Sequence, residues 1–253
     1  MGLSGFENLL YGRTMNLPDG TPIRYDSRNG APQIRQEMNG AYSIFNANGA
    51  TINGSEGGSR LNIVGSNGVT YNGRGEGNDS INMFNCNDSK VNGNDGHDSI
   101  GIYGGNNNTV NGGNGNDYIR NYSNNANING GFGNDSIYSR GNENYIDGSF
   151  GNDRISSVGN NNSVRGGWGN DAVSSWGNNN YVNGGFGNDA VSSWGSNNSV
   201  GGGAGNDRVG SFGFNNFVNG GSGFDAVSSN PGGGNIVRTG GLFGNFFSRF
   251  FGL

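Results

Sequence analysis

The chain has 253 residues, of which 54 are glycine and only 30% are hydrophobic, and its formal net charge is −5. Ordering a residue costs roughly 1–2 kcal/mol and glycine loses the most backbone entropy, so apolar burial alone is not expected to fold this sequence. The acidic balance and the lack of basic runs argue against a nucleic-acid partner. One cysteine excludes an internal disulfide, one cysteine with one histidine argues against structural zinc, and no apolar run reaches the ~20 residues of a membrane helix.

The first 41 residues do not repeat. Phe6, Leu9 and Leu10 have helical spacing, and Pro18-Asp19-Gly20 predicts a turn. We expect residues 1–41 to form an arm or cap over the first repeat, and the alternative is a frayed terminus. The opening MGLSGFENLLYGR lacks a basic start and a long apolar stretch, so no cleaved secretory signal is expected.

Residues 42–239 repeat one phrase, loosely at first and regularly from Asp79 to about Ile236. Successive copies read GGWGNDAVSSWGNNNYVN and GGFGNDAVSSWGSNNSVG, with a period of 18 residues. Chains rich in Gly, Asn and Ser are usually disordered, but a disordered linker has no reason to keep register. The period predicts a stack of repeats.

Each phrase contains two nonapeptides, and each nonapeptide carries one apolar residue. The first rank is Ile119, Ile137, Ile155, Val173, Val191, Val209 and Val227, and the second is Ile128, Ile146, Val164, Val182, Val200, Val218 and Ile236. A short strand with its central side chain turned inward fits this spacing, whereas the glycine content and the missing 3.6-residue period exclude helix. The sequence therefore predicts an all-β parallel β-roll or β-solenoid of about eleven coils, stacked about 4.8 Å apart, with short flanking segments 1–41 and 240–253.

The two edges of the predicted coil differ in length tolerance. From Val91 onward the step across the acidic edge is always nine residues, whereas Ile81 to Val91 and Ile100 to Val110, on the other edge, are ten. A loop that folds its carbonyl groups around an ion cannot vary in length, which would explain the constant step on the acidic edge. The acidic edge carries one aspartate per phrase: Asp79, Asp98, Asp117, Asp135, Asp153, Asp171, Asp189, Asp207 and Asp225.

Calcium suits this edge, because it takes six to eight hard oxygen ligands and accepts backbone carbonyls. Without a cation, aspartates in register roughly 5 Å apart repel one another. The plainer interpretation is an exposed turn in which Asp caps the local backbone. The opposite edge has uncharged Asn162, Asn180, Asn198 and Asn216 instead, for which we expect a structural amide ladder between coils.

The phrase GGxGNDxUx, in which U is apolar, resembles the RTX (repeats-in-toxin) nonapeptide GGxGxDxUx, over about residues 73–229. The resemblance implies calcium-dependent folding, a row of Ca²⁺ ions, and type I secretion through an uncleaved C-terminal signal. It places the sixth position on the nine aspartates and the first on Gly112, Gly130, Gly148, Gly166, Gly184, Gly202 and Gly220. Only alternate nonapeptides carry Asp, so calcium is expected along one edge. The loop containing His97 lacks the second glycine, which makes its site less regular, and His97 is expected to be a spacer.

Aromatic residues recur at both edges. The acidic edge has Phe132, Phe150, Trp168 and Phe186, and the other has Tyr122, Val158, Trp176, Trp194 and Phe212. We expect them to face outward, either stacking to shield the edge or forming a contact surface for another copy or a glycan. Ice binding is disfavoured because threonine forms no repeating rank.

The tail LFGNFFSRFFGL, within residues 240–253, has helical aromatic spacing. Its candidate surface residues are Phe243, Phe246, Phe247 and Phe250, followed by Phe251. A cap over the last coil, an export signal and a joint to another subunit all remain open for it.

No catalytic constellation is evident, so an enzyme is not expected. The first hypothesis is a secreted or cell-surface structural protein, hardened by Ca²⁺, that assembles with copies of itself into a filament or layer. The alternative is a monomeric adhesin that binds a glycan, ice or a cell surface.

Overall fold

The structure, a computed structural model, describes residues 12–239. The chain divides into two compact units, Met1–Asn127 and Ile128–Leu253. Both are all-β parallel solenoids, and together they comprise about eleven coils of about 18 residues, which confirms the predicted fold class. No helix within residues 12–239 is long and apolar enough to span a membrane. The N-terminal Phe6, Leu9 and Leu10 and the tail residues Phe243, Phe246, Phe247 and Phe250 lie outside the described residues.

The first unit opens with antiparallel strands. β1 pairs with β2, β2 pairs with β5, and β3 pairs with β4, all antiparallel. Leu17 and Ile23 are buried beneath them. The bounds are β1 Gly12–Asn16, β2 Pro22–Asp26, the 3-10 helix η1 Ser27–Asn29 and β3 Gln33–Gln36.

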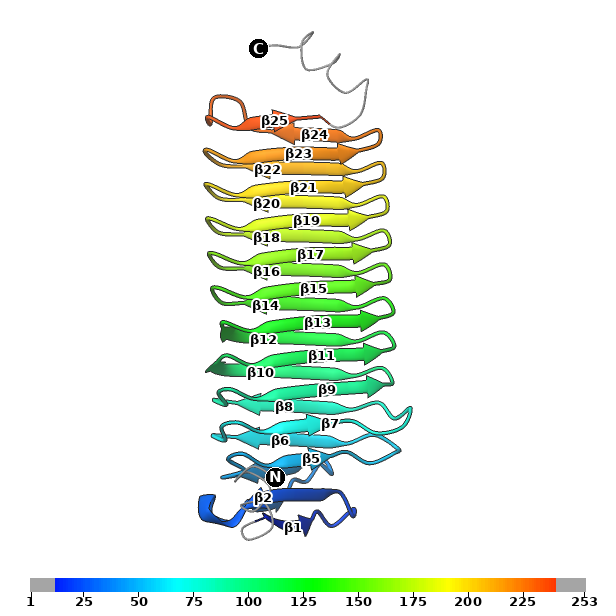
Figure 1. Ribbon diagram of the computed structural model, residues 1–253, viewed down its shortest axis with the longest axis vertical. Helices are drawn as coiled ribbons and strands as arrows, with labels where there is room; N and C mark the ends of the chain where they lie inside the picture. The colour runs from blue at the N-terminus through cyan, green and yellow to red at the C-terminus, as the bar shows by residue number, and fades with distance from the viewer. Residues whose placement is uncertain (1–11, 240–253) are drawn as a thin grey trace, which may run out of the picture. The chain divides into compact units, whose positions relative to one another are not determined.

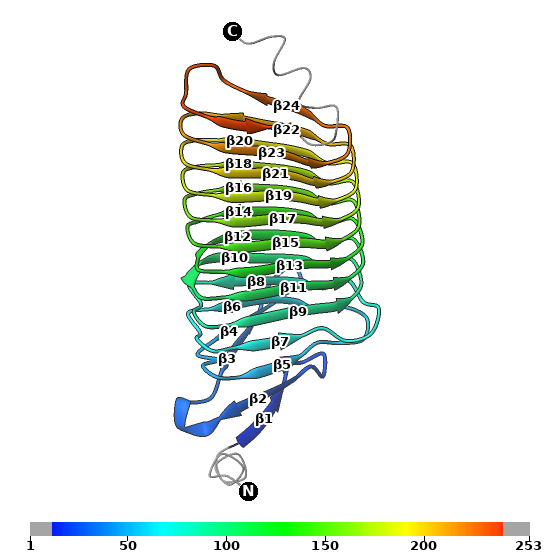
Figure 2. The same cartoon turned by 45° about the horizontal axis from the view of Figure 1, so that its top comes forward.

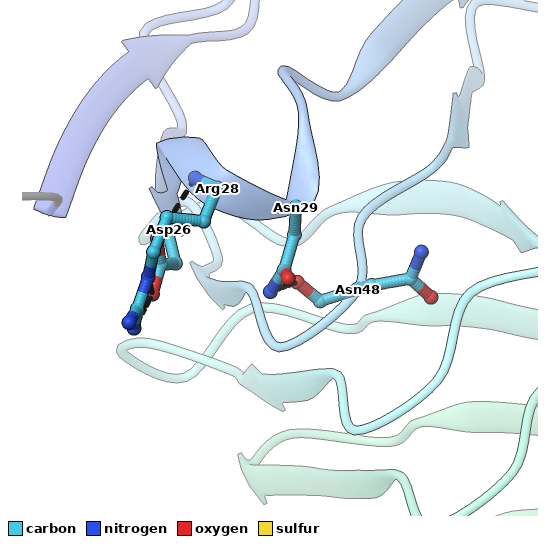
Figure 3. A network of polar contacts seen from close by, with 4 residues as sticks. All are labelled: Asp26, Arg28, Asn29 and Asn48. Carbon is cyan, nitrogen blue, oxygen red and sulfur yellow. Dashed lines mark hydrogen bonds and ion pairs between the residues drawn. The ribbon is translucent and has the colours of Figure 1, made fainter.

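A polar network fastens this opening segment to the coils (Figure 3). Asp26 caps η1 by accepting a hydrogen bond from the backbone N–H of Arg28, and the Arg28 guanidinium forms an ion pair with the same carboxylate. Asn29 Nδ2 donates to the backbone carbonyl of Asn48 at 3.2 Å. The turn of η1 is therefore bonded to a loop of the first coil.

The coils of the first unit start at Tyr42, where the degenerate repeat begins. Even-numbered strands pair in parallel in one sheet and odd-numbered strands in the other (Figures 1 and 2). The bounds are β4 Tyr42–Phe45, β5 Thr51–Asn53, β6 Arg60–Val64, β7 Thr70–Asn72, β8 Ser80–Phe84, β9 Lys90–Asp95, β10 Ser99–Asn106, β11 Thr109–Asn114 and β12 Tyr118–Asn124.

The second unit repeats the same two-sheet coil with little variation. Val173, Val191 and Val209 lie in direct register on β18, β20 and β22. The bounds are β13 Asn127–Phe132, β14 Ser136–Arg140, β15 Tyr145–Phe150, β16 Arg154–Val158, β17 Ser163–Trp168, β18 Ala172–Trp176, β19 Tyr181–Phe186, β20 Ala190–Trp194, β21 Ser199–Ala204, β22 Arg208–Phe212, β23 Phe217–Ser222, β24 Ala226–Ser229 and β25 Ile236–Arg238.

Each coil of the second unit before the last turns six positions inward, more than the two apolar positions expected from the sequence. In one coil these are Asp153, Ile155, Ser157, Asn162, Val164 and Gly166. The position of this serine is apolar in three coils of the first unit, where Ile63, Met83 and Ile102 are in register, and it is Asn121 in the next coil. The second unit therefore has only two apolar side chains per coil in its core, and its polar interior contacts matter more for stability. In the last coil the prediction that Ile236 belongs to the inward rank is wrong, because Val237 pairs with Val218 and Ile236 is 61% exposed.

The asparagine edge is held by hydrogen bonds between coils, although not in the form expected. The backbone N–H of Asn162 donates to Asn180 Oδ1 at 2.8 Å. Asn162 Nδ2 donates to the carbonyl of Gly141 at 3.0 Å and to Ser157 Oγ at 3.2 Å. The prediction of amide-to-amide bonding is thus wrong for this row, because the inward amides are spaced to serve the backbone of neighbouring coils.

The extra residue on this edge is accommodated in the first unit by a bulge. The pairing of β10 with β12 shifts register between Tyr103 and Asn106. Gly104 and Gly105 have φ values of 79° and 82° at this point. The asparagine edge therefore tolerates the ten-residue step that the sequence shows.

A substitution at Gly169 tests how closely the turns of neighbouring coils pack. Its φ is +128°, and a Cβ atom there would lie 1.8 Å from the Gly151 carbonyl oxygen of the preceding coil. We expect Gly169→Ala to lower the free energy of unfolding by about 3 kcal/mol or more, because it adds a backbone clash to an unfavourable φ. The control is Gly232→Ala, with φ +79° and nothing within 4 Å of the added atom, which is expected to cost about 1 kcal/mol. Urea unfolding in calcium measures both, and equal costs would contradict the stacking argument.

Candidate calcium site along the aspartate row

The aspartates form a buried row at the turn that leads from one sheet to the other. Asp79, Asp98 and Asp117 belong to the first unit, and Asp135, Asp153, Asp171, Asp189 and Asp207 belong to the second; each is 2% exposed. Asp225, in the last coil, is half-buried. Burial of the aspartates from Asp79 to Asp207 argues against the alternative interpretation, an exposed turn in which Asp caps the local backbone.

Within each unit, one carboxylate oxygen joins an aspartate to the backbone of the neighbouring coil. Asp171 Oδ1 accepts the backbone N–H of Asp153 at 2.7 Å, and Asp189 Oδ1 accepts that of Asp171 at 2.8 Å. The same bond joins Asp79 to Asp98 and Asp98 to Asp117 in the first unit. The Asp row therefore makes the same backbone contact as the Asn row on the opposite edge.

The first glycine of each phrase lies against the aspartate of that phrase. A Cβ atom at Gly166 would lie 2.4 Å from Asp171 Oδ2 and 2.3 Å from the Gly184 carbonyl oxygen of the next coil. The same holds at Gly130, Gly148, Gly184 and Gly202, and at Gly93 it involves the carbonyl of Gly112; at Gly220 the added atom would meet Asp225 Oδ2. The predicted glycines thus leave the space in which a carboxylate oxygen and a carbonyl oxygen approach each other.

The second carboxylate oxygen has no hydrogen-bond donor. Oδ2 is buried and unsatisfied in all nine aspartates, within the described residues. On the opposite edge the equivalent Asn Nδ2 is a donor and is satisfied by carbonyl and hydroxyl oxygens. An unpaired buried anion is costly, so the row requires a proton or a cation.

The pKa values of the aspartates reflect the same cost of burying a carboxylate. Burial raises the pKa of Asp98 and of Asp153 to about 7, and the neighbouring carboxylates of the row add to the rise. Burial also raises the pKa of Asp171 and Asp189 to about 6. Hydrogen bonds from neighbouring backbone N–H groups oppose these shifts in each case but do not cancel them.

The donor set fits calcium. The row supplies one carboxylate oxygen per coil next to a glycine carbonyl oxygen, and both are hard ligands that Ca²⁺ accepts. No three His, Cys, Asp or Glu side chains gather into a possible metal site anywhere in residues 12–239. An ion held here by the aspartates would take its remaining ligands from carbonyl groups and water. Its charge would neutralise the buried Oδ2 atoms and link neighbouring coils.

A second ladder runs beside the aspartates, and the sequence reading gave it no role. The asparagine that precedes most of the aspartates accepts a hydrogen bond from the next coil: Asn152 N–H donates to Asn134 Oδ1 at 2.7 Å, and Asn170 N–H donates to Asn152 Oδ1 at 2.7 Å. His97 takes this position in the first unit, and its Nδ1 accepts the N–H of Asn116 at 2.7 Å. The recurring Asn of GGxGND was the available signal for this ladder.

The aromatic residues lie at the outer ends of the strands. Phe132, Phe150, Trp168 and Phe186 stack in one row, with ring centroids 4.2–6.2 Å apart. Trp176, Trp194 and Phe212 stack in a second row, with centroids 4.9 and 5.8 Å apart. All seven side chains are exposed.

The repeated coil, with its row of aspartates and glycine carbonyls, defines a calcium-binding parallel β-solenoid. A family model for the RTX calcium-binding nonapeptide repeat matches four stretches, residues 102–120, 122–155, 159–182 and 177–209. The chain therefore carries RTX calcium-binding repeats, and the segment 102–209 belongs to that family. No curated protein and no solved structure gives a match.

The matched stretches contain the row from Asp117 to Asp207 but not Asp79, Asp98 or Asp225. These three are joined to it by the same bond, since Asp117 Oδ1 accepts from Asp98 N–H and Asp225 Oδ1 accepts from Asp207 N–H. We therefore propose all nine aspartates as ligands.

Exchanging Asp and Asn separates the charge from the backbone contact. In EGTA at neutral pH, Asp153→Asn is expected to raise the melting temperature by several degrees, because it keeps the Oδ1 acceptor and removes an unsatisfied buried anion. In calcium it is expected to lower both the number of bound ions and the stabilisation that calcium provides.

Two matched variants complete this measurement. Asp153→Ala loses the ladder bond as well and is expected to be less stable than Asp153→Asn in either buffer. Asn162→Asp on the other edge is expected to lower the free energy of unfolding by about 2 kcal/mol or more. The substitution replaces the donor Nδ2 with a carboxylate oxygen, which would then lie against the Gly141 carbonyl oxygen and Ser157 Oγ. Equal calcium binding by the wild type and Asp153→Asn would refute the assignment of that ligand.

Stability without calcium is expected to fall as pH rises from about 5 to 8. The raised pKa values of Asp153 and Asp171, about 7 and about 6, mean that the folded state binds more protons than the unfolded state in this range. The contribution is therefore largest at acid pH and is lost as pH passes through those values. Thermal melts in EGTA measure it; calcium should flatten or reverse the slope, and a rise in stability with pH in EGTA would contradict the expectation.

Proposed function

We propose that this protein is an extracellular structural protein, a β-solenoid stabilised by calcium that associates laterally with copies of itself through its aromatic rows. The observation that carries the proposal is the two rows of stacked, exposed rings in the second unit. Contiguous apolar strips of this kind on a soluble protein are typical of contact surfaces.

The stacking geometry favours a protein partner for these rows. The ring centroids of Trp176 and Trp194 are 4.9 Å apart and the rings are 5° from parallel, so the facing sides of the two rings cover each other. What remains exposed along the row is a line of ring edges. Two flat apolar strips of ring edges can bury a large surface area against each other. A ligand that stacks on ring faces has few exposed faces to bind along these rows.

The N-terminal segment favours lateral contact over end-to-end growth. Extending the parallel ladder requires open parallel strands at both ends of the stack. Here the first coil is covered by β2 and β3, which run antiparallel to β5 and β4. A second copy therefore has no parallel edge to continue at this end.

Calcium-dependent folding supports a location outside the cell. RTX repeats are characteristic of proteins that leave the cell by type I secretion, and we propose the same route here. A chain whose second unit has two apolar core side chains per coil, together with buried anions, gains little from folding before it meets calcium. Folding and association would then both begin after export.

Oligomeric state in calcium and in EGTA tests this function. Light scattering after size exclusion, with electron microscopy, should show oligomers or ordered assemblies in calcium and unassembled chains in EGTA. The double substitution Trp176→Ser and Trp194→Ser is expected to weaken association at least about tenfold, which corresponds to about 1.4 kcal/mol. Phe214→Ser is the matched control, because Phe214 is exposed but lies outside both stacked rows.

Monodisperse monomers in calcium at high protein concentration would overturn self-association, provided that circular dichroism shows folded β structure. Equal weakening by the control variant would also count against the rows as the contact.

A further inference from the structure

The outer face of the odd-numbered sheet in the second unit contains a hollow that borders one of the two aromatic rows and is not used by the calcium row. Its volume is about 370 Å³, and it lies beside Trp168 and Phe186, with Tyr181 and Asn183 at its other side. This volume lies within the range of small-ligand sites. We propose that the hollow binds a neutral sugar unit of a glycan.

The floor of the hollow follows from the backbone. Gly167 and Gly185 have φ values of +121° and +120°, and a Cβ atom at either would lie 2.0–2.2 Å from a carbonyl oxygen of the preceding coil. With these φ values a side chain at Gly167 or Gly185 would be strained, and Ser149, in register with Gly167 on β15, has a lower φ of 76°. The rings of Trp168 and Phe186, with centroids 4.2 Å apart, border this gap on one side.

Tyr181 differs from the stacked aromatic residues. Its neighbours in register on β17 and β21 are Ser163 and Ser199, which are too small to cover a ring. The side chain is 44% exposed, and it stacks on no other ring in the described part of the chain. Tyr181 thus offers a free aromatic face, on which the C–H face of a pyranose ring packs well.

The polar groups around the hollow suit hydroxyl groups. The Asn183 side-chain amide has no hydrogen-bond partner within residues 12–239, and its Nδ2 lies over Gly201, where an added Cβ would be 2.8 Å away. Asn supplies both a donor and an acceptor. Unused hydrogen-bonding capacity beside a free ring face is the pairing that recognises a sugar.

The charges favour a neutral ligand. Asp147 and Arg165 are direct neighbours on β15 and β17, so their opposite charges largely cancel at the site. Asp147 already accepts from Tyr145 Oη at 3.2 Å and from the Ser149 N–H at 3.1 Å, and Arg165 lies 5.6 Å from the centre of the Tyr145 ring. Both groups are held in place at the end of the hollow, where they can bond further to hydroxyl groups.

Titration of the full chain in saturating calcium with cellohexaose, chitohexaose and maltohexaose, followed by tryptophan fluorescence and calorimetry, tests the proposal. At least one sugar is expected to bind. Tyr181→Ala and Asn183→Ala should each weaken binding about tenfold or more, whereas Tyr181→Phe keeps the ring and should retain most of it. Tyr138→Ala, on the other sheet, is the control and should bind as the wild type does.

Melting temperatures of the variants in calcium establish that each is folded. Failure of all three sugars to bind, or binding that Tyr181→Ala leaves unchanged, overturns the proposal. A change in oligomeric state with Tyr181→Ala and no sugar binding would assign the hollow to a contact between copies. Trp176 and Trp194 do not line the hollow, so the sugar titration and the association test on those two residues give separate results.

Discussion

The structure depends on one contact, in which a turn side chain accepts a backbone N–H from the adjacent coil. Asp171 Oδ1 does this for Asp153, and Asn180 Oδ1 does it for Asn162 on the opposite edge. The buried backbone N–H groups of Asp153 and Asn162 need a hydrogen-bond acceptor, and the adjacent coil supplies it. Each coil accepts hydrogen bonds from the backbone of its neighbour. The stability of the fold therefore comes from stacking, and a single coil alone would have little stability.

The two edges make the same backbone contact and differ in their second polar atom. On one edge Asn162 Nδ2 is a donor that finds the Gly141 carbonyl and Ser157 Oγ. On the other, Asp171 Oδ2 is an acceptor beside the Gly184 carbonyl, and no donor is present. One atom per coil thus converts a self-sufficient edge into one that requires a cation, and this couples folding to calcium in an RTX repeat.

The glycines define the outside of the molecule as well as the calcium edge. Gly166 leaves space inside the coil for the carboxylate, whereas Gly167 faces outward with a φ at which a side chain would be strained. The outward gap separates the stacked ring of Trp168 from the free ring of Tyr181. The same backbone requirement therefore leads both to the metal row and to the hollow proposed as a sugar site.

The sequence by itself determined the coil length, the parallel β-solenoid and the residues of the aspartate row. These features follow from the 18-residue period and from the local conformational preferences of Gly, Asp and Val, which can be read from the sequence without knowledge of contacts between coils. It did not determine the burial of Asp153, the serine position at Ser157, or the bonding of Asn162 to backbone rather than to another amide. Only the tertiary structure decided these, because each depends on a partner in the next coil or across the core. The free face of Tyr181 was decided in the same way, since it depends on small residues 18 positions away on either side.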